Sequence, residues 1–177
     1  GMTAIGVGRA LALRMKASRA IVAIIIGDGT LGQGLVYESL NLAGVWRAPV
    51  LFVVENNGIA QTTPTAQTTA GDLELRGRAF GMRTWRFDDS EPDFFANVEE
   101  VVGHVRESRE PGFVVIDTQR LGPHSKGDDL RDRAEIEAIQ RRDPLARLGT
   151  TLPEQERTQI DREARTYITL LCASAAA

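Results

Sequence analysis

Apolar positions divide much of the chain into alternating strands and helices. Residues 20–26 are apolar throughout, which predicts a parallel strand buried on both faces. Apolar runs at residues 49–54 and 112–118 predict two further core strands, and residues 83–88 predict a shorter one. Helical patterns lie around these runs, at residues 4–16, 33–46, 71–80 and 92–109. This alternation predicts an α/β fold with a doubly wound, mainly parallel sheet and helices on both faces.

The last third of the chain has a different pattern. Residues 120–131 are polar and glycine-containing without periodicity, which predicts a mobile loop at the edge of the sheet where the strands end. Helices are predicted at residues 132–174. The longest of them, at residues 154–174, places five residues on one face: Ile160, Ala164, Tyr167, Ile168 and Leu171. No repeat or low-complexity linker divides the sequence, so residues 2–177 are predicted to form a single domain.

The helix predicted at residues 33–46 carries two apolar stripes. One stripe contains Val36 and Leu40, and the other contains Leu42 and Trp46. A helix with apolar residues on more than one side is covered on more than one side. The pattern therefore predicts a contact with another subunit, and hence a homo- or hetero-oligomer.

Composition and charge narrow the function classes. The 177 residues are 42% hydrophobic and 25% charged, which is typical of a globular domain. The formal net charge of -3 gives no general attraction for nucleic acid or an anionic membrane, so neither is predicted as a partner. Cys172 is the single cysteine and excludes an intrachain disulfide, which favours a cytoplasmic location. The apolar run at residues 20–26 is too short to span a bilayer.

The glycines after the first strand raise the question of a phosphate site. Gly27, Gly29 and Gly32 have the G-x-G-x-x-G spacing of dinucleotide-binding turns, and Glu55 ends the next strand, where an acid would bind a ribose. Asp28 argues against this interpretation. A carboxylate about 4 Å from a diphosphate charge costs about 4 kcal/mol at an effective dielectric of about 20, whereas a helix N-terminus contributes only about 0.3–2 kcal/mol. Repulsion dominates unless a cation intervenes.

Magnesium could supply that cation. It prefers oxygen ligands and is often shared between a protein carboxylate and substrate phosphates. Asn56 and Asn57 leave the next strand at the same predicted edge as Asp28, and an Asn side-chain oxygen is a neutral hard ligand. A carbonyl of the following loop could be a third ligand. By itself, however, Asn-Asn-Gly favours an ordinary turn at the end of a strand.

The two motifs together resemble a known fingerprint. GDG at residues 27–29 followed by NN at residues 56–57 is similar to the thiamine diphosphate motif. The text between and after them resembles the alpha subunit of the thiamine-dependent component of 2-oxo acid dehydrogenase complexes, which include pyruvate, branched-chain and acetoin members. RLGPHSKGDD at residues 120–129 is similar to the phosphorylation loop of that family, and RRDPLARL to its Asp-Pro helix start. The resemblance extends over residues 4–172 and implies the thiamine diphosphate-binding fold.

The resemblance implies a set of cofactor ligands in this chain. Asp28 and Asn57 would hold magnesium by their side chains and Ile59 by its carbonyl. The turn at Gly29 and Thr30 would offer backbone N–H groups to the diphosphate. The implied cofactor-binding residues of the two motifs are Gly27, Asp28, Gly29, Thr30, Asn57 and Ile59.

The predicted loop contributes a candidate catalytic residue. His124 matches the loop histidine that lies near the cofactor in the family, so it is both a catalytic and a cofactor-binding candidate; the alternative is a solvated histidine. Ser125 matches the serine that kinases modify in mitochondrial members, although nothing in the sequence indicates a kinase partner. Pro123 stands where the family commonly has histidine.

The resemblance also implies partners and a reaction. The family performs oxidative decarboxylation of a 2-oxo acid, or the corresponding reaction of acetoin, with acyl transfer to a lipoyl-bearing acyltransferase. Its beta subunit supplies the glutamate that activates the cofactor, and family members carry a segment ahead of residue 4 that contacts the cofactor. The chain alone is therefore expected to be inactive and to correspond to a truncated alpha subunit. Two alternatives stay open: a non-catalytic paralogue that dimerises or binds a partner, and a nicotinamide-binding domain.

Overall fold

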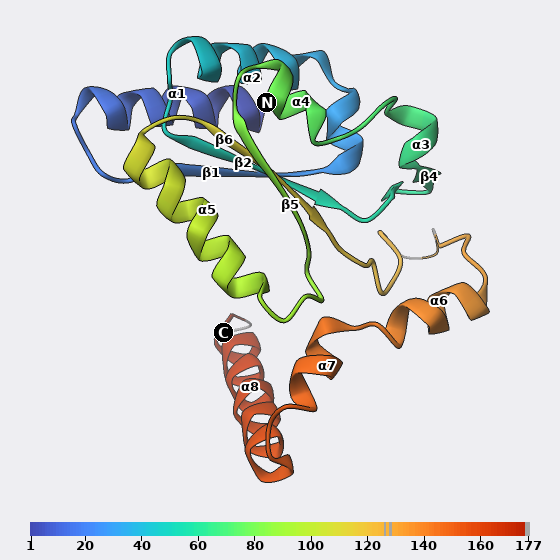
Figure 1. Ribbon diagram of the computed structural model, residues 1–177. Coiled ribbons are helices and arrows are strands. Elements are labelled where there is room, and N and C mark those ends of the chain that lie inside the picture. The colour runs from blue at the N-terminus through green and yellow to red at the C-terminus, as the bar shows by residue number, and fades with distance from the viewer. Residues whose placement is uncertain (126, 128, 176–177) are drawn as a thin grey trace.

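A parallel sheet forms the centre of the protein. The computed structural model describes residues 1–125, 127 and 129–175. Its sheet has the strand order β1-β2-β6-β5, and all neighbouring strands are parallel (Figure 1). The strands are β1 (Val22–Gly27), β2 (Val50–Asn56), β5 (Arg83–Asp88) and β6 (Gly112–Asp117). Their carboxyl ends share one edge, because Gly27 is level with Glu55, and Asn56 and Asp88 are both level with Asp117.

Helices cover both faces of this sheet, as the sequence predicts. Figure 1 shows α1, α2 and α4 over one face and α5 over the other. The helices are α1 (Met2–Met15), α2 (Gly34–Val45), α4 (Leu75–Ala79) and α5 (Phe94–Ser108). The predicted α/β fold is therefore confirmed.

Each face has its own apolar core. Phe52 and Phe113 are fully buried in the core beneath α1, α2 and α4. Val101 and Val105 of α5 pack into the second core on the opposite face. The approach of α4 depends on Gly77, because a Cβ at that position would lie 2.5 Å from the Cβ of Phe113. Apolar burial on both faces is the main source of stability of such a sheet.

The first strand differs from the prediction. Ile24 and Ile26 are buried, but Ala23 is exposed and Ile25 is 54% exposed. The reason is that β1 lies at the edge of the sheet, while α5 packs on β2, β5 and β6. The prediction of a strand buried on both faces is wrong for this chain by itself.

The segment between β2 and β5 also departs from the prediction. The helix expected at residues 71–80 is confined to α4. Gly71 adopts a left-handed backbone with φ of 72°, and the Asp72 side chain accepts from the N–H groups of Glu74 and Leu75 where α4 begins. Three short elements precede it: β3 (Ile59–Ala60), β4 (Thr63–Pro64) and α3 (Thr65–Thr68). The antiparallel β3–β4 hairpin was not predicted, since strands of two residues leave no periodic signal.

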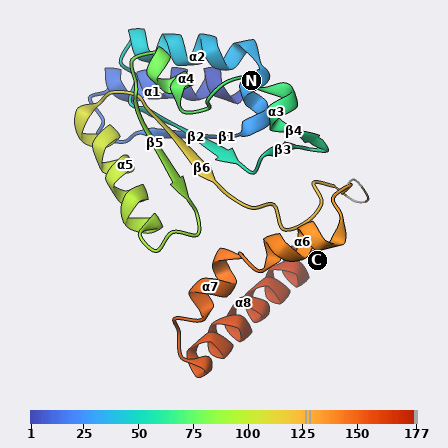
Figure 2. The same ribbon diagram turned by 45° about the vertical axis from the view of Figure 1, so that its right-hand side comes forward.

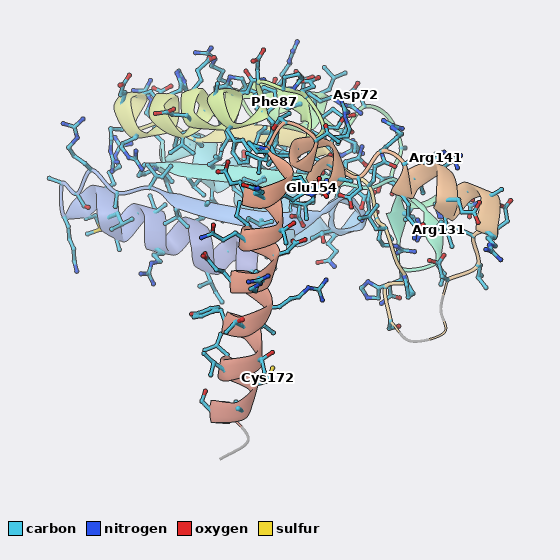
Figure 3. The ribbon with its side chains drawn as sticks, turned by 90° about the horizontal axis from the view of Figure 1, so that it is seen from below. Asp72, Phe87, Arg131, Arg141, Glu154 and Cys172 are labelled. Carbon is cyan, nitrogen blue, oxygen red and sulfur yellow. The ribbon has the colours of Figure 1, made fainter. Side chains whose placement is uncertain are left out.

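Three helices form a C-terminal arm, defined here as residues 133–175. They are α6 (Arg133–Gln140), α7 (Pro144–Gly149) and α8 (Glu154–Ala175). The side chains of Asp132 and Asp143 cap α6 and α7 by accepting from the N–H groups of Glu135 and Leu145. Figures 1 and 2 show the arm extending away from the sheet, and Figure 3 shows Cys172 of α8 far from it.

The predicted apolar faces of two helices are not covered within the chain. No residue of the three arm helices is buried, and Tyr167 and Ile168 are 63% and 57% exposed. The second stripe of α2 is also open, since Trp46 is 49% exposed. The subunit contact expected at α2 stays a prediction. In the described part of the chain, no helix has the length and apolar character needed to cross a membrane.

Candidate functional site

The candidate site lies at the carboxyl edge of the sheet, where β1 ends. A short 3₁₀ helix, η1 (Asp28–Gly32), follows β1 directly and is followed by α2. Asp28 is the first residue of η1, and it is only 2% exposed. The hydroxyl group of Thr65, in α3, donates a hydrogen bond to its Oδ2 atom. The sequence therefore places a buried carboxylate where the resemblance requires a metal ligand.

Asp28 has no cationic partner among the residues that the structure describes. The ion pairs in that part of the chain involve other carboxylates. A buried carboxylate is costly unless hydrogen bonds or a cation compensate for its lost hydration, and one neutral hydroxyl is weak compensation. The chemistry of this position therefore fits a bound cation.

The β3–β4 hairpin lies directly against η1. A Cβ at Gly29 would lie 2.4 Å from the Cβ of Ala60, so only glycine permits this approach. The contact brings the end of β2 and the hairpin to the turn that contains Asp28. Gly29, the second glycine of the GDG motif, is thus required for packing against the hairpin, independently of a role at a phosphate.

The turn into the hairpin presents two more oxygen atoms. The Oδ1 atom of Asn57 accepts a hydrogen bond of 3.1 Å from the backbone N–H of Ile59. Gly58, between them, has φ of 75°, a left-handed conformation that favours glycine. The N–H of Thr65 donates to the carbonyl of Gly58, so Ile59 and Pro64 are a non-hydrogen-bonded pair and the carbonyl of Ile59 faces away from β4. That carbonyl fits a metal ligand.

These oxygens suit a metal that binds amide and carbonyl groups. Among the described residues, no group of three or more His, Cys, Asp or Glu side chains is placed to hold a metal. A site here would therefore combine the Asp28 carboxylate with neutral oxygens of Asn57 and Ile59. That mixture is typical of magnesium sites, in which phosphate oxygens and water complete the coordination.

The backbone of η1 supplies donors for an anion. Gly27 ends β1, and Gly29 and Thr30 lie in the first turn of η1. The first N–H groups of a helical turn have no partner within that turn. The geometry also differs from a dinucleotide motif, because Gly32 ends the 3₁₀ helix and α2 begins only at Gly34.

The predicted mobile loop has an ordered base. Arg131 donates to the backbone carbonyls of Arg120 and Gly122, at 2.7 and 3.0 Å. It also forms an ion pair of 2.7 Å with Asp129, and the side chains of this pair are only 9% and 13% exposed. The hydrogen bonds from Arg131 lower the pKa of Asp129 to about 2. Figure 3 labels Arg131 beside the loop.

The same loop is tied to the hairpin. The Nη1 atom of Arg120 donates a hydrogen bond of 2.6 Å to the carbonyl of Gln61, in the turn of the hairpin. His124 is exposed and forms no hydrogen bond or ion pair with the described residues of the candidate site. The structure thus brings the implied ligands of η1 and the hairpin together and leaves His124 outside that group. Residues 126 and 128 of the loop, and residues 176–177, lie outside the described residues, and the mobility of the loop stays a prediction.

A network at the strand ends escaped the sequence analysis. The Nδ2 atom of Asn56 donates 2.6 Å to Oδ1 of Asp117, and Arg86 donates to both carboxylate oxygens of Asp117 at 2.7 and 3.0 Å. The hydrogen bonds with Asp117 raise the pKa of Arg86 above its ordinary value. Asn56 was visible in the NN motif, but Asp117 and Arg86 carry no local signal. Only the strand order β2-β6-β5 makes them neighbours.

Comparisons with known proteins show which family this sequence matches. The family model described as "Dehydrogenase E1 component" matches residues 2–169. Pyruvate dehydrogenase E1 component subunit alpha of Rickettsia prowazekii is 32% identical over 148 residues, which cover 81% of this chain and 45% of that protein. The alpha subunit of acetoin:2,6-dichlorophenolindophenol oxidoreductase of Cupriavidus necator is 35% identical over 174 residues, 91% of this chain and 52% of that protein. This chain spans about half the length of the curated relatives that it matches.

A solved structure shows the same fold. Transketolase of Campylobacter jejuni superposes with a TM-score of 0.54 at 16% identity, covering 65% of this chain and 18% of the transketolase chain. At this identity the likeness concerns the arrangement of strands and helices.

Proposed function

Because this chain belongs to the dehydrogenase E1 component family, we propose that it binds thiamine diphosphate through Mg²⁺ at the carboxyl edge of its sheet. The resemblance seen in the sequence to alpha subunits of 2-oxo acid dehydrogenases is confirmed by the relatives it matches. The cofactor and the metal are proposals. They are supported by the residues at the end of β1 and in the β3–β4 hairpin.

The observation that carries the proposal is the burial of Asp28. Its side chain is 2% exposed, and among the described residues its hydrogen-bond donor is the neutral Thr65 hydroxyl. Magnesium between this carboxylate and a diphosphate would compensate both negative charges, which would otherwise repel each other. A site for a nicotinamide dinucleotide would leave that repulsion in place.

Each part of the site has a distinct task. Asp28 and Asn57 would hold the ion by side-chain oxygens, and Ile59 by its carbonyl. The N–H groups of Gly29 and Thr30 would bind diphosphate oxygens, as amides of helical turns do. Thiamine diphosphate, when bound, supplies the carbon nucleophile for decarboxylation. The share of this chain is to fix the position of the diphosphate end.

The proposed reaction is that of the relatives' class. This chain would act as the alpha-type part of a 2-oxo acid or acetoin dehydrogenase, with a beta subunit that contributes the activating glutamate and a lipoyl-bearing acyltransferase that accepts the acyl group. His124 is proposed to assist later steps from the loop that Arg120 and Arg131 attach to the hairpin. The chain alone is expected to show no turnover, because the activating glutamate would come from the beta subunit. Orientation of the reacting groups contributes about 7–11 kcal/mol of barrier reduction, and the chain alone would not provide all of it.

Calorimetric titration tests the cofactor proposal. Thiamine diphosphate should bind the purified chain in Mg²⁺ and bind far more weakly in EDTA. Asp28→Ala should abolish the metal-dependent binding, whereas Asp161→Ala, the same change on exposed α8, should leave it unchanged. Far-UV circular dichroism confirms that both variants are folded. Equal affinity in EDTA would reject the metal bridge, and metal-independent binding of NAD would support the dinucleotide alternative.

One observation favours a second candidate function. The apolar residues of α8 are exposed, with Tyr167 63% and Leu171 46% accessible. A module that binds a partner without catalysis would use such a face. This candidate predicts association through α8 without any affinity for thiamine diphosphate, so the same titration separates the two.

A further inference from the structure

Asn56 and Asp117 end the adjacent strands β2 and β6 beside the candidate site, and Arg86 lies two residues before the end of β5. We infer that they form a positioning network that orients the Asn57 turn toward the metal, an inference that rests on the proposed function. None of the three is an implied ligand. Their contacts instead fix the residue that immediately precedes one.

Asn56 is anchored to the neighbouring strand at the end of β2. It is level with Asp117, the last residue of β6. The Asn56 side chain is held toward β6 by its 2.6 Å hydrogen bond to Asp117. Its backbone is held there as well, because the N–H of Thr118 donates 3.0 Å to the Asn56 carbonyl. With Asn56 fixed at both groups, the end of β2 from which the Asn57 turn leaves has a defined position.

Arg86 compensates the charge of Asp117. A carboxylate at this edge of the sheet would repel a diphosphate. Arg86 forms a two-bond fork with it, through Nε at 2.7 Å and Nη2 at 3.0 Å. Such a fork fixes the geometry of a carboxylate as well as compensating its charge. Arg86 therefore keeps Asp117 available as an acceptor for Asn56 without adding uncompensated negative charge near the cofactor.

Thr65 links the network to Asp28. Asn56 and Arg86 line a cavity of about 460 Å³, and Thr65 lines the same cavity. Thr65 donates the hydrogen bond that holds Asp28, and its backbone N–H donates 2.9 Å to the carbonyl of Gly58 in the Asn57 turn. The residues that hold Asp28 and the Asn57 turn, which carry the two proposed side-chain ligands, therefore line the same cavity. Partners of this kind around a metal ligand set its orientation and affinity.

The test uses one arginine of β5 against another. Arg86→Met removes the fork, and Asn56→Leu removes the amide that it supports. Arg83→Met is the matched control, since Arg83 lies on the same strand and pairs with Glu100 at 3.3 Å, away from the site. Hydrogen exchange in the cofactor-free chain should show faster exchange of the Ile59 amide in the two network variants and no change in the control. Unchanged Ile59 exchange in Arg86→Met and Asn56→Leu would overturn the inference.

A second measurement relates the network to the metal. In calorimetric titrations at saturating thiamine diphosphate, the Mg²⁺ concentration for half-saturation should rise about tenfold in Arg86→Met and Asn56→Leu. It should stay at the wild-type value in Arg83→Met. If Arg86→Met does not fold, Arg86→Lys retains the charge without the fork, and a rise in half-saturation is again expected.

The outcomes separate the two proposals. If the wild-type chain binds thiamine diphosphate with Mg²⁺ and the network variants bind it equally well, the positioning role is wrong and the proposed function stands. If the wild-type chain shows no metal-dependent binding, the proposed function fails, and the network has no metal to orient.

Discussion

The sheet body and the C-terminal arm differ in how far their apolar side chains are covered. In the body, residues 1–118, helices and strands bury one another's apolar side chains, and Phe52, Phe113 and Val115 are fully inaccessible. In the arm, α8 has a comparable apolar stripe, yet Ile168 and Leu171 are 57% and 46% exposed. An amphipathic pattern therefore specifies a helix without specifying that the chain itself covers its apolar face. The candidate site lies in the body, at the edge of its buried core.

The body and the arm differ in the cofactor ligands that they carry. Apart from His124 on the loop, the predicted ligands of the cofactor lie on elements whose positions are fixed by packing, such as Gly29 against Ala60. The arm carries no implied ligand, and its helices bury no residue. Precise chemistry at the strand ends needs the rigid region, because small displacements of ligands weaken a site strongly.

The largest expected effect separates the two regions by stability. Phe113→Ala should lower the free energy of unfolding by about 3–5 kcal/mol, because it opens a cavity in a fully buried core. Leu171→Ala, on the exposed face of α8, should change it by less than about 0.5 kcal/mol. Urea denaturation followed by circular dichroism measures both. Comparable losses would show that the arm is covered in solution and would break the contrast.

An intermediate effect is expected inside the body, at the turn of the site. Gly29→Ala should destabilise the protein by about 1–3 kcal/mol, because the new Cβ would lie 2.4 Å from the Cβ of Ala60. Gly103→Ala is the control: apart from its own helix backbone and chain neighbours, no atom lies within 4 Å of its added Cβ, and alanine favours the helix α5 by about 0.8–1 kcal/mol. Thermal unfolding of both variants decides the sign of each change. A stable Gly29→Ala protein would contradict the close contact between η1 and the hairpin.

A smaller effect is expected in the loop that joins the two regions. Asp129 is bound by Arg131, which lowers its pKa from an ordinary 3.8 to about 2. A lowered pKa in the folded state means that the interaction contributes above the ordinary value and is lost as the pH falls from about 4 to 2. A carboxyl ¹³C titration should place the midpoint of Asp129 near 2, and Arg131→Met should return it toward 3.8. A midpoint that does not move in Arg131→Met would mean that the ion pair is absent in solution.

The sequence predicted the central strands of the body better than it predicted the environment of the edge strand β1. Continuous apolar runs located β2 and β6, because central parallel strands are buried on both faces. The same signal was misleading for β1, since an apolar run does not reveal whether a strand lies at an edge, and Ile25 is half exposed. The Asp28 and Asn57 ligands could be proposed from motif spacing. Thr65, Asp117 and Arg86 could not, because long-range strand order and the hairpin alone bring them to the site.

The most direct test of the central claim localises the metal in the chain. With thiamine diphosphate and Mn²⁺ in place of Mg²⁺, since both ions favour oxygen ligands, backbone NMR signals close to the ion are broadened by its unpaired electrons. The account predicts strong broadening at Gly29, Thr30 and Gly58, with the signals of α8 left sharp. Sharp signals at those three residues, with broadening elsewhere or none, would contradict a metal-bridged diphosphate at the end of β1.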